Sequence, residues 1–311
     1  MESNSSTSSS SHEIRAIVLW SIAVVVSVFC IDRLGAWALT RVLLGTSSRQ
    51  AELYGGGMKH DILAVGDSRG VNGFYTPKIS SETGNSAFNI SHNGMTPNIV
   101  DALVRDYIQF NAAPKLVVIE TSCIAGTEIP ESIAIYSPYL QFSSRFRVLF
   151  DEKISTKYHR FQVSHLHRMN SELFLRGLTY FKKSDQYWIN HRTIDEAAIR
   201  RVEDGGPVEL PLSVEGAKLI GRLASELEGK GILVKLVMSP YLPEYLDRIT
   251  NLPDWIQKVE KYTGRNVFDY SNLQLTPDGF ADSLHLNQTG GEMFLDKLIE
   301  DDVISTIRNS P

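Results

Sequence analysis

Short apolar segments alternate with amphipathic segments along most of this chain, and that alternation constrains its fold more than any other feature. The run Val117-Val118-Ile119 and the run 233–237 are rich in valine, isoleucine and leucine, which is typical of strands covered on both faces. Thr96-Pro97 and Ser213 are typical of the first turns of helices. The expected strands are 61–65, 87–90, 116–120, 232–238 and 266–270, and the expected helices are 97–110, 214–228, 253–262 and 290–299. The sequence therefore predicts an α/β fold in which helices flank a parallel sheet.

The stretch 125–212 departs from this alternation and holds no segment typical of a buried strand. Residues 142–201 contain twelve Lys or Arg against six Asp or Glu. We expect a mainly helical insertion between two strands. It is either a packing cap with a solvated basic face, or a lid or groove for an anionic or carbohydrate substrate. His159, His165 and His167 lie within it, but no acid or cysteine completes a set at ligand spacing, so we expect no metal and no cofactor.

An uncharged apolar run occupies residues 16–31, near the N-terminus. The run is slightly shorter than a full membrane span, but its flanks extend it, with Arg15 and Arg33 able to reach the interfaces. We predict a retained single-pass transmembrane anchor over 14–39. The Ser-rich tail 1–13 cannot bury enough surface to fold, so we predict disorder there. A cleaved signal peptide and a buried helix of a soluble protein are the alternatives.

A linker, 40–59, is expected after the anchor, because it ends in Gly55-Gly56-Gly57 and no Gly-Lys-Ser/Thr follows to make a phosphate loop. The Lys and Arg residues after the apolar run modestly favour a cytoplasmic C-terminal domain, so charge alone leaves the orientation open. A net charge of −5 and a pI of about 5.9 provide no basic field for nucleic acid. Cys30 and Cys123 are the only cysteines, and we expect no disulfide between them.

Two short motifs carry the chemistry. Gly66-Asp67-Ser68 follows an apolar strand, and Asp282-Ser283-Leu284-His285 lies near the C-terminus. A serine on a tight turn after a parallel strand lies at the carboxyl edge of the sheet, where open α/β folds bind their ligands. An imidazole with a carboxylate three residues before it can take a proton from that serine. The pair of motifs therefore predicts a Ser–His–Asp site for acyl transfer.

With these motifs the chain resembles the SGNH, or GDSL-like, hydrolases, a superfamily of serine esterases, lipases and carbohydrate O-acyltransferases or deacetylases. The segment ILAVGDSRG matches the first block of the family, which implies that Ser68 is the nucleophile. The segment DSLHLN matches the last block, which implies His285 as the base and Asp282 as its orienting acid. The resemblance also implies a flavodoxin-like sheet of the SGNH type, formed by residues 60–124 and 213–311.

The second and third family blocks are matched less closely. The segment FNISHNGMTP resembles the second block, which implies that Gly94 joins the Ser68 amide in binding an oxyanion. The third block normally supplies an Asn as a further oxyanion donor, but Thr121-Ser122 stands in its place. Asn93 is a candidate substitute for that Asn. Loss of one such donor typically costs about 10²–10³ in rate.

Membrane-anchored relatives that act on envelope polysaccharides also depart from the third block, so the resemblance implies an extracytoplasmic esterase or O-acyltransferase acting on an envelope carbohydrate. The first alternative is a catalytically inactive protein that organises other envelope proteins and keeps the fold. A lipase or thioesterase is the second, although the charged insertion does not suggest an acyl channel. Each site residue also has a structural alternative. Ser68 could cap the helix that follows its strand, and Asp282 could cap a turn ahead of the last helix. His285 could be a hydrogen-bonded histidine at a domain edge, and His92 could compete as a base.

Overall fold

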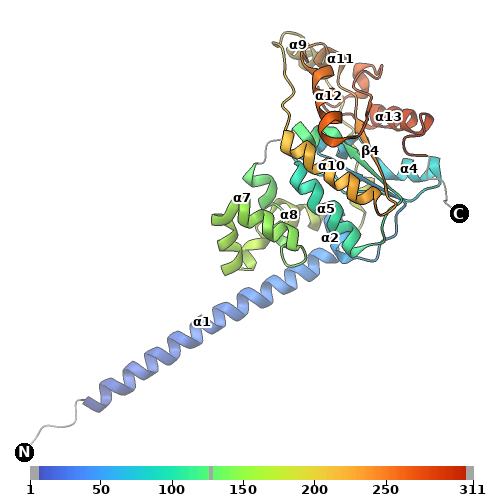
Figure 1. The fold of residues 1–311 in the computed structure, drawn as a ribbon. Helices are drawn as coiled ribbons and strands as arrows, with labels where there is room; N and C mark the ends of the chain where they lie inside the picture. Colours follow the sequence, from blue (N-terminus) through green and yellow to red (C-terminus); the bar gives the residue numbers. More distant parts are fainter. Residues whose placement is uncertain (1–6, 126–128, 306–311) are drawn as a thin grey trace, which may run out of the picture.

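The core of the molecule is a five-stranded parallel sheet with helices on both faces (Figure 1). The computed structural model describes residues 7–125 and 129–305. The strands are β1 (Ile62–Val65), β2 (Ala87–Asn89), β3 (Leu116–Glu120), β4 (Leu233–Met238) and β5 (Val267–Asp269), and they lie in the order β2-β1-β3-β4-β5. All four neighbouring pairs are parallel. This order is that of a flavodoxin-like fold, so the predicted α/β class is confirmed.

Alternate residues of each central strand face opposite helical layers. Leu63 of β1 and Val117 of β3 belong to the core beneath α5 and α10, whereas Ile62 and Val118 belong to the core beneath α4 and α13. Both faces are thus buried, which is why the strands are continuously apolar rather than alternating. The helices of this domain are α3 (Ser68–Gly73), α4 (Thr76–Thr83), α5 (Pro97–Phe110), α10 (Val214–Glu228), α11 (Pro243–Leu246), α12 (Leu252–Thr263), α13 (Gln288–Glu300) and the 3₁₀ turn η6 (Pro277–Gly279).

Helices α5 and α10 begin at the residues that the sequence predicted. Ser213 is the N-cap of α10, and its hydroxyl accepts a hydrogen bond from the Gly216 amide at 3.0 Å. Pro97 occupies the first turn of α5, where a missing N–H costs nothing. Thr96 precedes it in extended conformation, but its side chain makes no capping hydrogen bond.

The insertion between β3 and β4 is mainly helical, as predicted. Residues 126–128 of the expected range 125–212 lie outside the described residues. The insertion's elements are α6 (Pro130–Ala134), α7 (Ser144–Val163), α8 (Glu172–Gly177), α9 (Glu196–Glu203) and the 3₁₀ turns η2 (Ser137–Tyr139), η3 (Leu166–Met169), η4 (Leu178–Tyr180) and η5 (Asp185–Tyr187), with η1 (Thr121–Ala125) leading into it. Helix α7 is interrupted at Ile154, whose φ of −139° is not helical.

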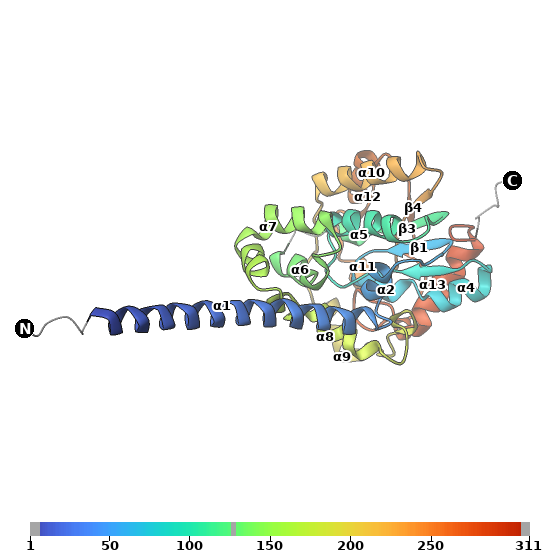
Figure 2. The ribbon, with the colours of Figure 1, turned by 90° about the horizontal axis from the view of Figure 1, so that it is seen from below.

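A single long helix, α1 (Thr7–Leu44), projects from this domain (Figures 1 and 2). Its 38 residues span about 57 Å at 1.5 Å per residue. It is long and apolar enough to cross a membrane, and the side chains of its apolar run are exposed along the whole run. The predicted tail 1–13 differs from this: residues 1–6 lie outside the described residues, and Thr7–Glu13 are helical because a long helix extends cooperatively from its apolar centre.

The segment 40–59, which we expected to be a flexible linker, is instead largely helical and packed. Its first residues continue α1, and α2 (Arg49–Gly55) follows after a short turn, with most of its side chains buried. Gln141 Nε2 donates a hydrogen bond to Thr40 Oγ1 at 2.9 Å. A side chain at Gly177 would lie 2.5 Å from Leu43 Cδ1, so the glycine allows α8 to pack directly on α1. The expectation of a flexible linker was wrong because the glycine run carries no information about the contacts that this segment makes with the insertion.

Candidate active site

Ser68 is the first residue of α3, directly beyond the carboxyl end of β1. Asp67 caps this helix, since its carboxylate accepts a hydrogen bond from the Arg69 amide at 2.9 Å. The turn is tight: a Cβ on Gly66 would lie 2.7 Å from Glu120 Cβ, and one on Gly70 would lie 2.6 Å from Ser91 Oγ. The glycines on either side of the serine thus let the turn pack against β3 and against the loop after β2.

We predict that Gly66→Ala destabilises the protein by about 1–3 kcal/mol, which is the usual effect of forcing a methyl group into a packed site. Labelling of Ser68 by a serine-reactive probe should fall as well, because the turn that carries it must shift. Unfolding in detergent measures the first effect. Gly206→Ala is the matched control, since a Cβ at that position meets nothing within 4 Å. Equal unfolding free energies of the two variants would contradict the prediction.

A second turn, between η6 and α13, carries Asp282 and His285. Phe280 and Leu286 pair as an antiparallel bridge at its base, and the Ala281 amide donates to the His285 carbonyl at 2.8 Å. Asn287 holds the turn to α13, because its side chain caps the helix by accepting from an amide of the first turn and donates to the Asp278 carbonyl. Because these hydrogen bonds fix the turn, the four residues 282–285 are enough to position the side chains of Asp282 and His285.

The structure brings Ser68, His285 and Asp282 into one hydrogen-bonded chain. His285 Nε2 lies 2.8 Å from Ser68 Oγ. His285 Nδ1 lies 2.9 Å from each carboxylate oxygen of Asp282. With the Nδ1 proton given to Asp282, Nε2 is left as an acceptor facing the serine hydroxyl, which is the arrangement that general-base activation requires.

The carboxyl group of Asp282 is set up to remain ionised. Partial burial on its own would raise its pKa, but hydrogen bonds from the His285 ring and from the backbone amides of Leu284 and His285 hold the pKa below its usual range. An ionised Asp282 stabilises positive charge on the imidazole and fixes its tautomer. The Asp282 side chain is 46% exposed, so solvent also reaches the aspartate end of the Ser68–His285–Asp282 hydrogen-bond series.

The two other residues predicted for the oxyanion site, Asn93 and Gly94, lie in the loop after β2. The His92 amide donates to the Gly66 carbonyl at 3.3 Å, which places this loop beside the turn that carries Ser68. Gly94 has a φ of +70°, a conformation that favours glycine, and both residues are exposed. Among the described residues, neither makes a hydrogen bond to Ser68 itself, so their contribution to an oxyanion site remains a prediction.

Ser122 lies in η1, directly after β3, and its hydroxyl is already engaged beneath the serine turn. Ser122 Oγ lies 2.6 Å from Asp67 Oδ1 and also hydrogen-bonds the Glu120 carboxylate. A single hydroxyl proton serves only one of these acceptors at a time. Burial, followed by the charge of Glu120, raises the pKa of Asp67 to about 6. Ser122 thus supports the turn of Ser68 and is not directed to a substrate.

A buried arginine completes this cluster, and sequence reasoning missed it. Arg69 follows the candidate nucleophile directly and is only 4% exposed. Its Nε donates to Ser239 Oγ at 3.0 Å and lies 3.5 Å from Glu120 Oε1, and its guanidinium lies 3.5 Å above the Tyr241 ring. The available signal was Glu120, because an acid at the end of a fully apolar strand needs a buried partner.

The ring of His92, the competing base suggested by the sequence, is directed toward the insertion. His92 is buried, and its Nε2 lies 3.8 Å from Glu172 of the insertion. Burial, followed by the nearby charge of Arg176, lowers the pKa of His92 to about 4. Because Ser68 Oγ is hydrogen-bonded to the ring of His285, the geometry favours His285 over His92 as the base. Within residues 7–125 and 129–305, no three His, Cys, Asp or Glu side chains are arranged to hold a metal ion.

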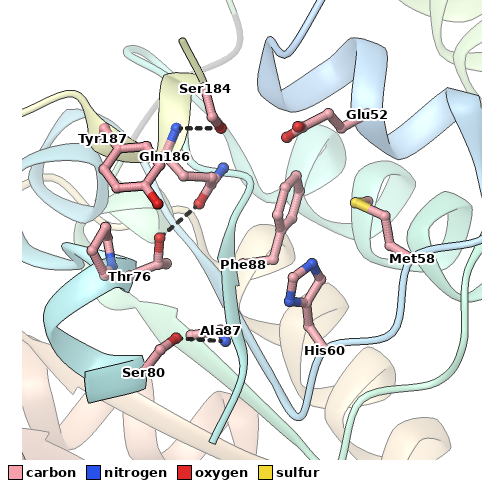
Figure 3. A pocket seen from close by; sticks show the side chains of 11 residues that line it. Glu52, Met58, His60, Thr76, Ser80, Ala87, Phe88, Ser184, Gln186 and Tyr187 are labelled. Atoms are coloured by element: carbon pink, nitrogen blue, oxygen red, sulfur yellow. Dashed lines mark hydrogen bonds between the residues drawn. The ribbon is translucent and has the colours of Figure 1, made fainter. Parts of the chain in front are cut away.

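A separate cavity of about 500 Å³ lies along β2, the edge strand of the sheet (Figure 3). Gln186 of η5 bridges to this edge, because its side-chain oxygen accepts from the Asn89 amide at 2.8 Å and its nitrogen donates to the Asn89 carbonyl at 3.0 Å. The insertion thus takes the place of a sixth strand there. The cavity is lined by Glu52, Met58, His60, Thr76, Pro77, Ser80, Ala87, Phe88, Ser184, Gln186 and Tyr187.

Glu52 in this cavity gives the protein a predictable pH dependence. Burial, followed by the charge of Asp185, raises the pKa of Glu52 from 4.5 to about 7. Between these values the folded protein binds a proton that the unfolded chain has released, so its stability falls as the pH rises through this window. We expect Glu52→Gln to raise the unfolding free energy by about 1–2 kcal/mol at pH 8, after allowing for solvent screening, and to change it little at pH 5.

Thermal unfolding of Glu52→Gln at several pH values between 4 and 8 checks this expectation. The exposed Glu196→Gln is the control, because its side chain is 86% exposed and its replacement should not alter the pH profile. A stabilisation by Glu52→Gln of equal size at pH 5 and pH 8 would mean that the carboxyl group of Glu52 titrates normally.

Comparison with known proteins finds solved structures that are similar to this chain. No protein-family model and no curated protein matches the sequence. Among solved structures, the chain is similar to a protein described as an acylhydrolase from Bacteroides fragilis, with 15% identity over 84% of this chain and 96% of that chain and a TM-score of 0.41. It is also similar to a GDSL-like lipase from Bacteroides thetaiotaomicron, with 12% identity over 78% and 86% and a TM-score of 0.37. The function proposed below rests on the geometry of the site and not on these values.

Proposed function

We propose that this chain is a membrane-anchored serine acyl-transfer enzyme, an ester hydrolase or O-acyltransferase, that acts on an acylated carbohydrate of the cell envelope. The observation that carries the proposal is the hydrogen-bonded chain from Ser68 through His285 to Asp282. It lies beyond the carboxyl end of β1, where the strand order reverses between β1 and β3. Ligands of open α/β sheets bind at such a switch point.

In the first half-reaction, Ser68 Oγ attacks the ester carbonyl carbon while its proton passes to His285 Nε2. The negative charge that develops on the carbonyl oxygen is bound by the backbone amides of Ser68 and Gly94, with Asn93 as a further donor. The imidazolium of His285 then gives its proton to the leaving alcohol, and the acyl group remains on the serine. Asp282 stabilises the imidazolium throughout.

In the second half-reaction, His285 takes a proton from an incoming hydroxyl group, which attacks the acyl-enzyme. If the hydroxyl belongs to water, the product is a free acid and the enzyme is an esterase. If it belongs to a sugar, the acyl group is transferred. The two outcomes use the same acyl-enzyme and differ only in which acceptor reaches Ser68, so both belong to one proposal.

The choice of an envelope carbohydrate is supported by the tether and by the insertion. A helix with an exposed apolar surface over residues 16–31 suits an enzyme held at a membrane, and a tether is useful for a large, immobile substrate. The insertion presents the exposed aromatic rings of Phe181 and Tyr187, which are 53% and 64% exposed. Aromatic faces of this kind stack on sugar rings. We place the domain outside the cytoplasm on this basis.

The experiment that tests the reaction uses the full chain in detergent, with p-nitrophenyl acetate as acyl donor, and measures acetate release with and without an acetylatable oligosaccharide. Ser68-dependent acetate release without an acceptor would establish an esterase. Ser68-dependent acetylation of the oligosaccharide would establish a transferase. If wild type and Ser68→Ala are indistinguishable in both assays, the chain is not an acyl-transfer enzyme.

One observation favours a second candidate, a non-catalytic assembly protein of the envelope. Ser122, which stands where the related enzymes carry an oxyanion-binding Asn, is hydrogen-bonded beneath the turn and does not replace that donor. In this alternative, the insertion would bind other envelope proteins. It predicts a folded protein whose Ser68 does not react with fluorophosphonates.

A further inference from the structure

The C-terminal end of α7 is fastened to α1 at one level of the long helix. The Asp32 carboxylate accepts hydrogen bonds from the amides of His165 and Leu166, at 2.8 and 3.1 Å. The next residue, Arg33, donates to the Val163 carbonyl at 3.4 Å. Asp32 thus caps the first turn of η3 from a different helix, and the end of α7 cannot move along α1 without breaking these bonds.

This level is where the apolar run ends. Residues 16–31 carry no charge, and Asp32 follows them directly. The N-terminal part of α1 extends beyond the insertion without contacting it (Figure 1), and its large side chains are exposed. When the bilayer-spanning part of α1 ends at Ile31 and the residues before Ala16 complete its length, the end of α7 lies at the height of the lipid headgroups.

The chain at that height is basic. Residues 153–168 contain four Lys or Arg and three His and no Asp or Glu, although the whole chain has a net charge of −5. Arg160 and His159 are exposed, and Val163 is 78% exposed despite being apolar. The cationic and histidine residues of the segment are Lys153, Lys157, His159, Arg160, His165, His167 and Arg168.

We propose that residues 153–168, the end of α7 together with η3, form a surface that binds the anionic phospholipid headgroups of the bilayer in which α1 is anchored. The inference rests on the proposed membrane anchor but not on the proposed chemistry. Basic side chains near an anionic leaflet are attracted to it over about a Debye length, and an exposed apolar side chain enters the interface. The long helix and this surface together hold the domain at a fixed height and orientation.

The test uses the full chain in nanodiscs of phosphatidylcholine alone or with 30% phosphatidylglycerol, a composition chosen for the experiment. Val163→Cys carries a bimane fluorophore in a Cys30→Ser background, since Cys123 is buried and does not react. A nitroxide on the lipid headgroup quenches fluorophores that lie near it. Gln257→Cys, on the exposed face of α12, provides the reference label away from α1 (Figures 1 and 2).

We expect strong quenching at position 163, little at position 257, and an increase at 163 when phosphatidylglycerol is present. Arg160→Glu should weaken the docked state on the order of tenfold, because it removes one positive charge and adds a negative one. Arg222→Glu, an exposed reversal on α10, should leave the quenching unchanged. Equal quenching at 163 and 257, no response to phosphatidylglycerol, or equal effects of both charge reversals would overturn the proposal.

Further measurements distinguish the lipid-binding surface from the proposed anchor, from a glycan-binding surface and from the proposed chemistry. A label at Val25→Cys, quenched by a nitroxide on the acyl chain, reports whether α1 is inserted. Insertion without headgroup quenching at position 163 would refute the surface while leaving the anchor intact. A soluble acidic polysaccharide that competes with phosphatidylglycerol would lower the headgroup quenching at position 163. If it does so, and if Arg160→Glu abolishes binding of that polysaccharide, the surface binds a glycan instead of the lipid. Ser68 labelling is read in the same samples and reports the chemistry independently.

Discussion

Replacement of Ser68 by alanine is expected to remove covalent labelling by a fluorophosphonate and to lower esterase turnover by about 10⁴–10⁶-fold. The hydroxyl that lies 2.8 Å from His285 Nε2 is then lost, and the imidazole no longer has this group to activate. His285→Ala should have nearly the same effect, because an unassisted serine hydroxyl is a weak nucleophile. Asp282→Asn should retain some labelling and lose up to about 10⁴-fold in turnover, through the wrong imidazole tautomer.

Gel-based labelling of the purified full chain in detergent measures the first effect, and hydrolysis of p-nitrophenyl acetate measures the second. Ser81→Ala is the control, since Ser81 is exposed and its hydroxyl only donates to the Lys78 carbonyl. Labelling that survives in Ser68→Ala would show that another residue reacts. Absence of labelling in a folded wild-type protein would favour the assembly protein.

Arg69→Leu is expected to destabilise the protein by about 3–5 kcal/mol, the usual effect of removing one partner of a buried ion pair. Glu120, which is fully buried, would then face no positive charge, and Asp67 lies close by as a second acid. The guanidinium also donates to the carbonyl of Pro240 and packs over the Tyr241 ring, so several contacts are lost at once. Chemical unfolding in detergent measures the change.

Arg265→Leu is the matched control. Its guanidinium also pairs with an acid, Glu228, but both side chains are partly exposed, at 24% and 37%, and such pairs contribute about 0–1 kcal/mol. The double variant Arg69→Leu, Glu120→Gln should recover part of the loss, because it removes the uncompensated buried charge. A change below 1 kcal/mol for Arg69→Leu alone would mean that Glu120 does not depend on Arg69 for compensation of its burial.

The elements of the sheet and both reactive motifs could be predicted from the sequence because their causes are local. A strand buried on both faces is continuously apolar, so 116–120 and 232–238 were found within a residue of β3 and β4. The strand-then-glycine order at Gly66 places Ser68 at a sheet edge, and the offset of three residues lets Asp282 reach His285 within one turn. These features could be predicted without knowing which segments pack together in the tertiary structure.

The remaining features depend on contacts between segments far apart in the chain, and no local pattern encodes those. The pairing of Arg69 with Glu120 and Ser239 needs α3 and the ends of β3 and β4 to meet, and the attachment of Asp32 to the end of α7 needs the insertion to fold back on α1. The residues 40–59 looked flexible because their glycines are visible in the sequence and the surface that buries them is not. Local sequence thus determined the strands, the helices and the identity of the reactive side chains. Only tertiary packing decided that Ser68 and His285 meet, that a buried arginine supports them, and that the C-terminal part of the long helix packs against the domain.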